Sequence, residues 1–285
     1  MLRIASKSAC PVCRAKDTSH SGGANRASPL PWAAVTSPIP LHPPRRAVML
    51  AAGDGGRLGA LTERLPKPLL PINGRALANY TLEALASARI EEVVVVTGYR
   101  QSQVVAALTC DAPAALQLTF VSNPRFHGHA SLSLRAAREH CGDEPFLLVM
   151  SDHLLSTALV ARLLAAEPAA MAAVAADFGQ RDPAYIKEAT KLSIRPGAAN
   201  RVAAIGKSLA SWDALDAGAF VIQRGAWQTI EAAPEDCELS VIFSSLAAAS
   251  ELTAIDITGD FWYDIDTAED LAGATTGLAL IDADG

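Results

Sequence analysis

The sequence has few aromatic residues, few charged residues and no long apolar run. Aromatic residues make up 5% of the 285 residues and charged residues 19%, whereas 50% are hydrophobic. No apolar segment reaches the roughly 18 residues of a membrane span, so we expect none. The formal net charge of −6 indicates no strongly basic surface, and we expect no nucleic-acid partner. Alanine-rich helices packed on a sheet of Val and Leu fit this composition.

The five cysteines form no metal-binding pattern. Cys10 and Cys13 make a lone CPVC with one histidine nearby, which falls short of the four ligands of a structural zinc site. Cys110, Cys141 and Cys237 are scattered along the chain. We expect these three to be small buried side chains in a reducing compartment, which favours a cytoplasmic location.

Residues 1–44 differ from the rest of the chain. They are rich in Ser, Pro, Gly and Ala, carry five basic residues against one acid, and show no helical or strand period. Such a segment buries too little apolar surface to offset its chain entropy, so it is predicted to be a disordered extension. Its composition resembles a transit peptide, but a nonfunctional extension or an upstream start codon is the favoured interpretation. The folded domain is then predicted to cover residues 45–285.

Short apolar strands alternate with helical segments after this extension. Strands are predicted at 46–52, 91–98, 116–123 and 145–152, and helices at 75–88, 101–108 and 131–140. Continuous apolar runs are typical of strands that are buried on both faces. Their alternation with helices predicts a three-layer, Rossmann-like α/β fold with a mostly parallel sheet. Ligands of such sheets bind beyond the carboxyl ends of the strands.

The second half of the chain has a less regular pattern. A β-hairpin is predicted at 190–194 and 201–206, strands at 217–223 and 251–257, and helices at 238–250 and 267–280. Thr267 is the expected N-cap of the last helix. With no clean linker after residue 45, the sequence favours one domain in which a small subregion contains the hairpin.

A glycine-rich segment, AAGDGGR at 51–57, follows the first strand. It does not match the P-loop motif G-x-x-x-x-G-K-[ST]. Gly53 and Gly55 fit the dinucleotide motif G-x-G-x-x-G, but Leu58 stands at its third glycine. The next strand also ends in VVTGYR, without the acidic residue that would bind a ribose. A dehydrogenase is therefore disfavoured.

The same segment has the chemistry of a phosphate-binding loop. Gly53, Gly55 and Gly56 lack Cβ atoms, so backbone N–H groups can approach phosphate oxygens. Arg57 offers a planar fork for two such oxygens, and the prolines on either side of Lys67 hold its backbone stiffly. A simple glycine turn with two surface cations would explain neither the glycine density nor the paired prolines.

The segment LAAGDGGRL…LPKPLLPINGRAL resembles the opening signature of nucleotidyltransferases that make activated sugars and alcohols, LAAGxGxRL…PKPLLxxxG. It departs at Gly56, where Thr or Ser is usual. The resemblance implies that Arg57 holds a nucleoside triphosphate and that Lys67 bridges the donor and acceptor phosphates. The nucleotide-binding residues that it implies are Ala51, Ala52, Gly53, Gly55, Gly56 and Ser131.

Three aspartates are candidate ligands of Mg²⁺, which would screen the repulsion between two phosphorylated substrates. Asp152 follows an apolar strand, while Asp264 and Asp266 lie in FWYDIDTAEDL. Each could instead be a helix cap or a turn acid. The resemblance implies one metal ligand after the central strand, which Asp152 matches, and one late aspartate. Either Asp264 or Asp266 could be this late ligand, and Asp264 is the favoured one. His153 could either contact phosphate or have a structural role.

The segments VMSDH, HASLSLRAARE, EATKLSI, WDALDAGAFVI and FWYDIDTAEDL extend the resemblance over residues 46 to about 275. They are most similar to inositol-phosphate cytidylyltransferases and their phosphocholine-type relatives. This resemblance implies transfer of a nucleotidyl group from CTP to inositol 1-phosphate with release of pyrophosphate. On the acceptor side it implies Lys191, Asp216 and Glu188, although Lys191 could instead be an exposed strand lysine.

Two alternatives stay open at this point. One is a sugar-1-phosphate guanylyl- or thymidylyltransferase. The other is a catalytically silent nucleotide-binding homologue, which the presence of Arg57, Lys67 and Asp152 argues against. The oligomeric state is likewise open, and a homodimer is one option.

Overall fold

The computed structural model describes residues 2–3, 43–166, 170–179, 183–198 and 200–283. Most of the segment that was predicted to be a disordered extension lies outside these ranges. Its residues Leu2–Arg3 form a short strand, β1, that pairs antiparallel with β6.

Four parallel strands form the first half of a ten-stranded sheet. They lie in the order β6-β5-β2-β7. Their bounds are β2 Arg46–Ala51, β5 Glu92–Thr97, β6 Gln117–Ser122 and β7 Phe146–Met150. β5 contributes four consecutive valines that are all buried, because their side chains alternate between the two covered faces of the sheet. The predicted parallel block is confirmed.

The second half of the sheet contains antiparallel pairs. Its strands are β9 Ala172–Asp177, β10 Lys191–Ile194, β11 Val202–Gly206, β12 Ala214–Ile222 and β13 Leu252–Asp256. β12 runs antiparallel to β7, β9 and β10, and β10 and β11 form the predicted hairpin. β13 is parallel to β9. β9 was not predicted, because its sequence AAVAAD is dominated by alanine, a weak strand former.

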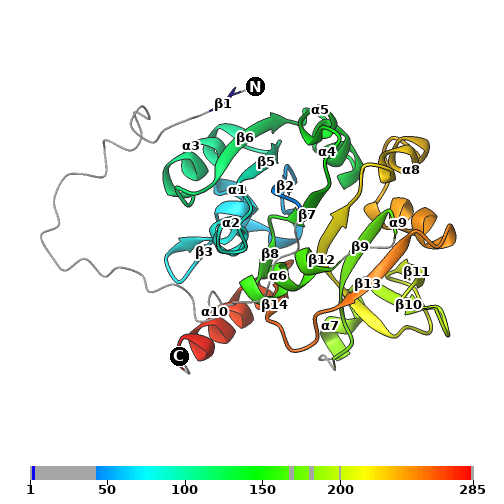
Figure 1. Ribbon diagram of the computed structural model, residues 1–285. Coiled ribbons are helices and arrows are strands. Elements are labelled where there is room, and N and C mark those ends of the chain that lie inside the picture. The colour runs from blue at the N-terminus through cyan, green and yellow to red at the C-terminus, as the bar shows by residue number, and fades with distance from the viewer. Residues whose placement is uncertain (1, 4–42, 167–169, 180–182, 199, 284–285) are drawn as a thin grey trace, which may run out of the picture.

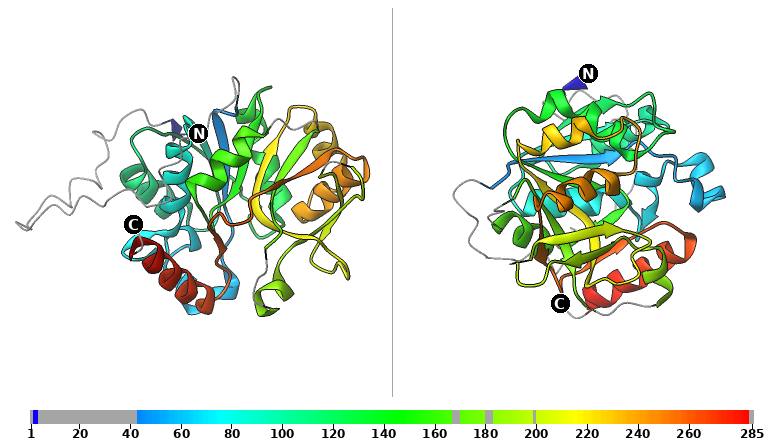
Figure 2. Two further views of the ribbon diagram at one scale, coloured as in Figure 1. Left: turned by 60° about the horizontal axis from the view of Figure 1, so that its bottom comes forward. Right: turned by 90° about the vertical axis from the view of Figure 1, so that its right-hand side faces the viewer.

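Helices cover both faces of the sheet (Figures 1 and 2). α2 Leu77–Ser87, α3 Gln101–Asp111 and α6 Thr157–Ala165 contribute to one buried cluster. Helices on the other face are α4 Ala130–Ala136, α5 Arg138–Cys141, α8 Ala226–Ala232 and α9 Leu239–Ala248. The three predicted layers are confirmed, although the helix expected at 131–140 is divided into α4 and α5.

A third, smaller cluster lies beside the main sheet and supports the late aspartates. β8 His153–Leu155 pairs antiparallel with β14 Trp262–Asp264, and β3 Pro71–Ile72 pairs with β4 Arg75–Ala76. Ile265 is fully buried in this cluster, together with residues of α10, which spans Ala268–Ala283. Figure 1 shows α10 (red) below β8 and β14.

Thr267 is the N-cap of α10, as predicted. The N–H of Asp270 donates to Thr267 Oγ1 over 3.1 Å, and the N–H of Thr267 donates to Asp270 Oδ2 over 2.8 Å. This reciprocal pair satisfies backbone donors at the start of the helix. It therefore fixes the point at which the chain leaves β14 and enters α10.

The cysteine expectation holds in part. Cys141 and Cys237 are buried free thiols, whereas Cys110 is half-buried and disulfide-bonded, so the expectation is wrong for Cys110.

Among the described residues, no helix combines the length and the apolar character that crossing a bilayer requires.

Truncation of Leu85 tests the packing of α2 on the sheet. Leu85 is fully buried, and Leu61 is 42% exposed. Leu85→Ala should lower the free energy of unfolding by about 2–5 kcal/mol, because it leaves a cavity in the core. Leu61→Ala is the matched control, with an expected change within about 0.5 kcal/mol. Urea denaturation of both variants measures the difference, and equal losses would contradict this assignment of the core.

Candidate active site

The glycine-rich loop begins where β2 ends and closes into a short 3-10 helix, η4 Gly56–Leu58. Gly55 has φ 69°, in the left-handed region that favours glycine. A Cβ at Gly55 would lie 3.0 Å from the Cβ of Lys67, so the loop and the lysine are packed closely together. α1 Ala60–Arg64 follows the loop. Gly55 is thus required both by its own conformation and by its neighbour.

Lys67 lies in the PKP segment, which forms the 3-10 helix η5 Lys67–Leu69. The residue is only 8% exposed. Its Nζ donates to Asp152 Oδ2 over 2.7 Å and to Asp266 Oδ1 over 2.9 Å. Burial works to lower the pKa of Lys67, but the two aspartates outweigh it and raise the pKa above its ordinary value. The ammonium group therefore stays charged at neutral pH.

Arg57 joins the same network from the glycine-rich loop. Its Nη1 lies 2.6 Å from Asp266 Oδ2, so Asp266 contacts one cation with each carboxylate oxygen. The Arg57 side chain is 59% exposed, against 10% for Lys67. The Arg57 side chain is therefore accessible to a ligand, whereas the Lys67 side chain is buried and held by its two aspartates.

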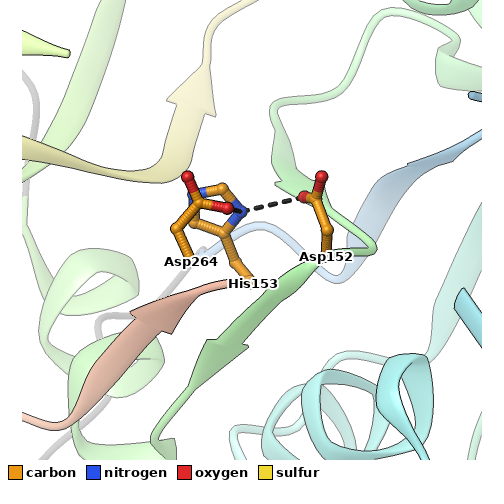
Figure 3. A group of neighbouring side chains, drawn as sticks. All are labelled: Asp152, His153 and Asp264. Carbon is orange, nitrogen blue, oxygen red and sulfur yellow. Dashed lines mark hydrogen bonds and ion pairs between the residues drawn. The ribbon is translucent and has the colours of Figure 1, made fainter. Parts of the chain in front are cut away.

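Asp152, His153 and Asp264 form a second cluster beside Lys67 (Figure 3). The pairing of β8 with β14 places His153 directly opposite Asp264. His153 Nδ1 lies 2.9 Å from Asp152 Oδ1 and 3.6 Å from Asp264 Oδ1. One potential ligand atom from each residue lies within 4.8 Å of the others. The local pairing of two short strands therefore builds this cluster.

The electrostatics of the cluster show crowded negative charge. Burial opposes ionisation of Asp152, yet Lys67 and His153 hold its pKa well below the usual range. Burial raises the pKa of Asp264 to about 6, with Asp152 and Asp266 adding to the effect. Burial lowers the pKa of His153, but Asp264 and Asp152 outweigh it and raise that pKa to about 9. Carboxylate oxygens at this spacing fit a hard divalent cation such as Mg²⁺.

Two cavities meet at these charged residues. One, of about 500 Å³, is lined by the three loop glycines and by Phe126, His127 and Gly128. The other, of about 350 Å³, lies toward β12 and the N-terminus of α9. Arg57, Asp152 and Asp266 line both cavities. The cations and carboxylates that were predicted from distant parts of the sequence are thus brought into a shared cleft.

The predicted nucleotide-side residues differ in their exposure to the cleft. Gly53, Gly55 and Gly56 line the larger cavity. Ala51 and Ala52 are buried at the end of β2. Ser131 is also buried, and its hydroxyl donates to Glu235 O over 2.9 Å and accepts from Cys237 N over 2.8 Å. Phe126 and Gly128 were not predicted to line this cavity; the sequence signal is that they lead directly into α4.

On the acceptor side, Asp216 and Glu188 line the smaller cavity, and Lys191 does not. The ammonium group of Lys191 donates to Lys207 O over 2.8 Å and to Ala189 O over 3.3 Å. Lys207, directly after β11, lines the cavity in its place. Sequence reasoning missed Lys207, although a lysine at the end of the second hairpin strand was a usable signal.

Other lining residues of the smaller cavity come from three elements. α7 Pro183–Glu188 supplies Tyr185, β12 supplies Asp216, and the start of α9 supplies Glu238 with Ser240. Burial raises the pKa of Asp216 to about 7. The hydrogen bond that the Gly218 N–H donates to the Asp216 carboxylate works against this rise. Side chains of this kind hydrogen-bond to hydroxyl groups.

Comparison with known proteins places this geometry in a family context. Residues 47–247 match the family described as MobA-like NTP transferase domain. A bifunctional IPC transferase and DIPP synthase of Rubrobacter xylanophilus is 35% identical over 229 residues, which cover 79% of this chain and 50% of that protein. The protein of the same name from Aquifex aeolicus is 30% identical over 230 residues, 80% of this chain and 50% of its own length. The chain therefore spans about half the length of these curated relatives.

The fold is similar to that of a solved structure of a nucleotide transferase. The structure of the inositol-1-phosphate CTP transferase from T. maritima superposes with a TM-score of 0.72. It shares 22% sequence identity, and the superposition covers 84% of this chain and 96% of that one. The match of the family over most of the chain, together with this fold, shows that the chain belongs to the MobA-like NTP transferase family.

Proposed function

We propose that this protein is a Mg²⁺-dependent cytidylyltransferase that transfers CMP from CTP to inositol 1-phosphate and releases pyrophosphate. The observation that carries the proposal is the position of Lys67 in the wall of the larger cavity, where its ammonium group lies between Asp152 and Asp266, two residues that line both cavities. The names of the relatives, IPC transferase and inositol-1-phosphate CTP transferase, support this choice of substrates. The proposal covers the transferase activity alone.

The transfer requires no nucleophilic side chain. An oxygen of the acceptor phosphate attacks the α-phosphorus of CTP, and the bond from that phosphorus to the pyrophosphate oxygen breaks. The protein's task is to hold two anions in line and to stabilise the charge that moves to the leaving group. We assign to Lys67, in the wall of the larger cavity, the contact with both phosphates. We assign to Arg57 and the loop N–H groups, which line the same cavity, the outer phosphates of CTP.

Asp152 and Asp264 are the proposed ligands of Mg²⁺. Their oxygens belong to one cluster with His153, whereas Asp266 lies outside that cluster and pairs with Arg57 and Lys67. When bound, the metal ion would offset the negative charge of the α-phosphate and of the leaving pyrophosphate. Asp266 is then the carboxylate that aligns Lys67 with Arg57. This division gives separate roles to the two late aspartates that the sequence left open.

Residues of the smaller cavity are the proposed acceptor site. Lys207 supplies a cation for the acceptor phosphate, and Asp216, Glu188 and Glu238 supply acceptors for hydroxyl hydrogen bonds. Lys191 acts one step away, because its ammonium group holds the carbonyl oxygen of Lys207. The combination of one phosphate-binding cation with several carboxylates fits a phosphorylated polyol.

The nucleotide is proposed to occupy the larger cavity. Gly53, Gly55 and Gly56 present their backbone to the phosphates. Ala51 and Ala52 set the point where the loop leaves β2, and Ser131 fixes the start of α4. These three small residues therefore contribute by shaping the cavity, with no side-chain contact to the nucleotide.

A substrate panel tests the proposal directly. The full chain with Mg²⁺ is incubated with each of four NTPs and with inositol 1-phosphate or hexose 1-phosphates, and pyrophosphate is measured. Release with CTP and inositol 1-phosphate is expected. Release only with GTP or dTTP and a hexose phosphate would replace the proposal with a guanylyl- or thymidylyltransferase. Tight nucleotide binding without release from any pair would indicate a silent homologue.

Asp152→Asn tests the metal site. The change keeps the size of the side chain but removes the charge, so kcat should fall by about 10³-fold or more while the fold is retained. Asp143→Asn makes the same change at a carboxylate that is 63% exposed and paired with Arg224, and its turnover should stay normal. Near-normal turnover of Asp152→Asn, with circular dichroism unchanged, would remove Asp152 from the metal site.

The raised pKa of Asp216 predicts a pH-dependent stability. Because the folded-state pKa of about 7 exceeds the ordinary 3.8, the stability contribution of this group is present below pH 3.8 and is lost as the pH rises through 7. Asp216→Asn mimics the neutral form. In EDTA it should therefore gain stability over the wild type by up to about 1.4 kcal/mol per pH unit across this window. Urea titrations at pH 5 and pH 8 measure the gain, for which Asp143→Asn is the control. An equal effect at both pH values would contradict a raised pKa.

A further inference from the structure

His153 is a buried histidine that lines the cleft, and the proposed transfer reaction gives it no role. Its side chain is 11% exposed, and it lines the smaller cavity as the first residue of β8. The acceptor phosphate is already ionised when it attacks, so the reaction needs no general base from the protein. The position of His153 therefore calls for another role.

Three elements fix the place of this imidazole. The backbone of His153 lies opposite Asp264 in the β8–β14 pair. The carbonyl oxygen of His153 accepts a hydrogen bond from the hydroxyl group of Thr81, which is fully buried on α2. Its ring packs against Gly218 of β12, which has φ 74°. A Cβ at Gly218 would lie 2.4 Å from the ring atoms Cδ2 and Nε2. A side chain at position 218 would consequently push the ring out of its place.

The imidazole in turn fixes Asp152. An ionised carboxylate can only accept hydrogen bonds, so Nδ1 of His153 is the donor in its contact with Asp152. Nδ1 donates to Oδ1 over 2.9 Å, while Lys67 donates to Oδ2 over 2.7 Å. Two donors from different elements thereby set the plane of one carboxylate (Figure 3 shows the His153 contact).

The same ring also stands between the two proposed metal ligands. Its Nδ1 lies 3.6 Å from Asp264 Oδ1 and 2.9 Å from Asp152 Oδ1, so one ring nitrogen faces a carboxylate oxygen of each residue. Without the imidazole, the like charges of Asp152 and Asp264 would repel, and Asp152 would be held through Lys67 alone. Partners that orient metal-binding side chains in this way affect metal affinity although they do not touch the metal.

We propose that His153 is a positioning residue of the metal centre, which holds Asp152 and Asp264 at the separation and orientation that a divalent cation requires. Gly218 is the residue that leaves room for it. This inference rests on the proposed function, because it takes these two carboxylates as the metal ligands.

Two substitutions of His153 separate its donor from its bulk. His153→Asn keeps an N–H group on the atom that corresponds to Nδ1, whereas His153→Leu keeps apolar volume and removes the donor. Gly218→Ala displaces the ring and leaves His153 in the chain. His140→Asn, on α5 and outside both cavities, is the histidine control.

The measurement is Mn²⁺ binding to the full chain, followed by electron paramagnetic resonance, with no nucleotide present. Mn²⁺ is the probe because it shares the preference of Mg²⁺ for carboxylate ligands. His153→Leu and Gly218→Ala should weaken Mn²⁺ binding by about 10–100-fold. His153→Asn should stay within about threefold of the wild type, and His140→Asn should be unchanged. In turnover assays His153→Leu should lower kcat and leave the KM for CTP nearly constant.

A merely structural role predicts another pattern. If His153→Leu melts at a lower temperature but binds Mn²⁺ within twofold of the wild type, the proposal is overturned. If Gly218→Ala does not fold, the comparison of Leu with Asn at position 153 still decides. Absence of Mn²⁺ binding by the wild type also overturns it. The expected Mn²⁺ pattern in a protein that releases no pyrophosphate from any substrate pair would uphold this inference and defeat the proposed function.

Discussion

The cleft depends on the ammonium group of Lys67. It contacts Asp152 and Asp266, which lie 85 and 199 residues further along the chain. A charge buried to this degree costs several kcal/mol unless it is paired. The glycine-rich loop packs directly on the Lys67 side chain. One ion-paired lysine therefore links the loop, the end of β7 and the segment before α10.

The charge around Lys67 explains how an acidic protein can bind two phosphorylated molecules. The chain has a net charge of −6, and the smaller cavity alone is lined by six carboxylates against Arg57, Lys207 and a histidine. Such a surface would repel a triphosphate. The cations at the junction and a metal ion on the carboxylates reverse the sign locally, where the phosphates meet. An excess of acid is then compatible with a polyanionic substrate, because it gives the metal ion its ligands and the acceptor its hydrogen-bond partners.

The sequence predicts best what depends on local pattern. The buried valine run of β5, the glycines after β2 and Asp152 after β7 all follow from strand periodicity and from the position of ligands at strand ends. It predicts less well what depends on side-chain direction within a pair of strands. Lys191 donates to backbone carbonyl oxygens, and Lys207, one residue beyond the Gly206 that pairs with Lys191, lines the cavity. The sequence places both lysines at this end of the hairpin but does not show which of them faces the cavity.

The two late aspartates show where this limit lies. Asp264 and Asp266 are two residues apart, and Ile265 between them is buried away from the cleft. Because side chains alternate along an extended segment, the sequence could predict that both aspartates face the cleft. Their separate contacts depend on where the extended chain stops. β14 ends at Asp264, which keeps that residue opposite His153. The N–H of Asp266 then donates to Asp270 Oδ2 in the capping turn of α10, which directs its carboxylate to Lys67 and Arg57. A helix cap thus separates the two carboxylates, and only the folded chain shows which contact each one makes.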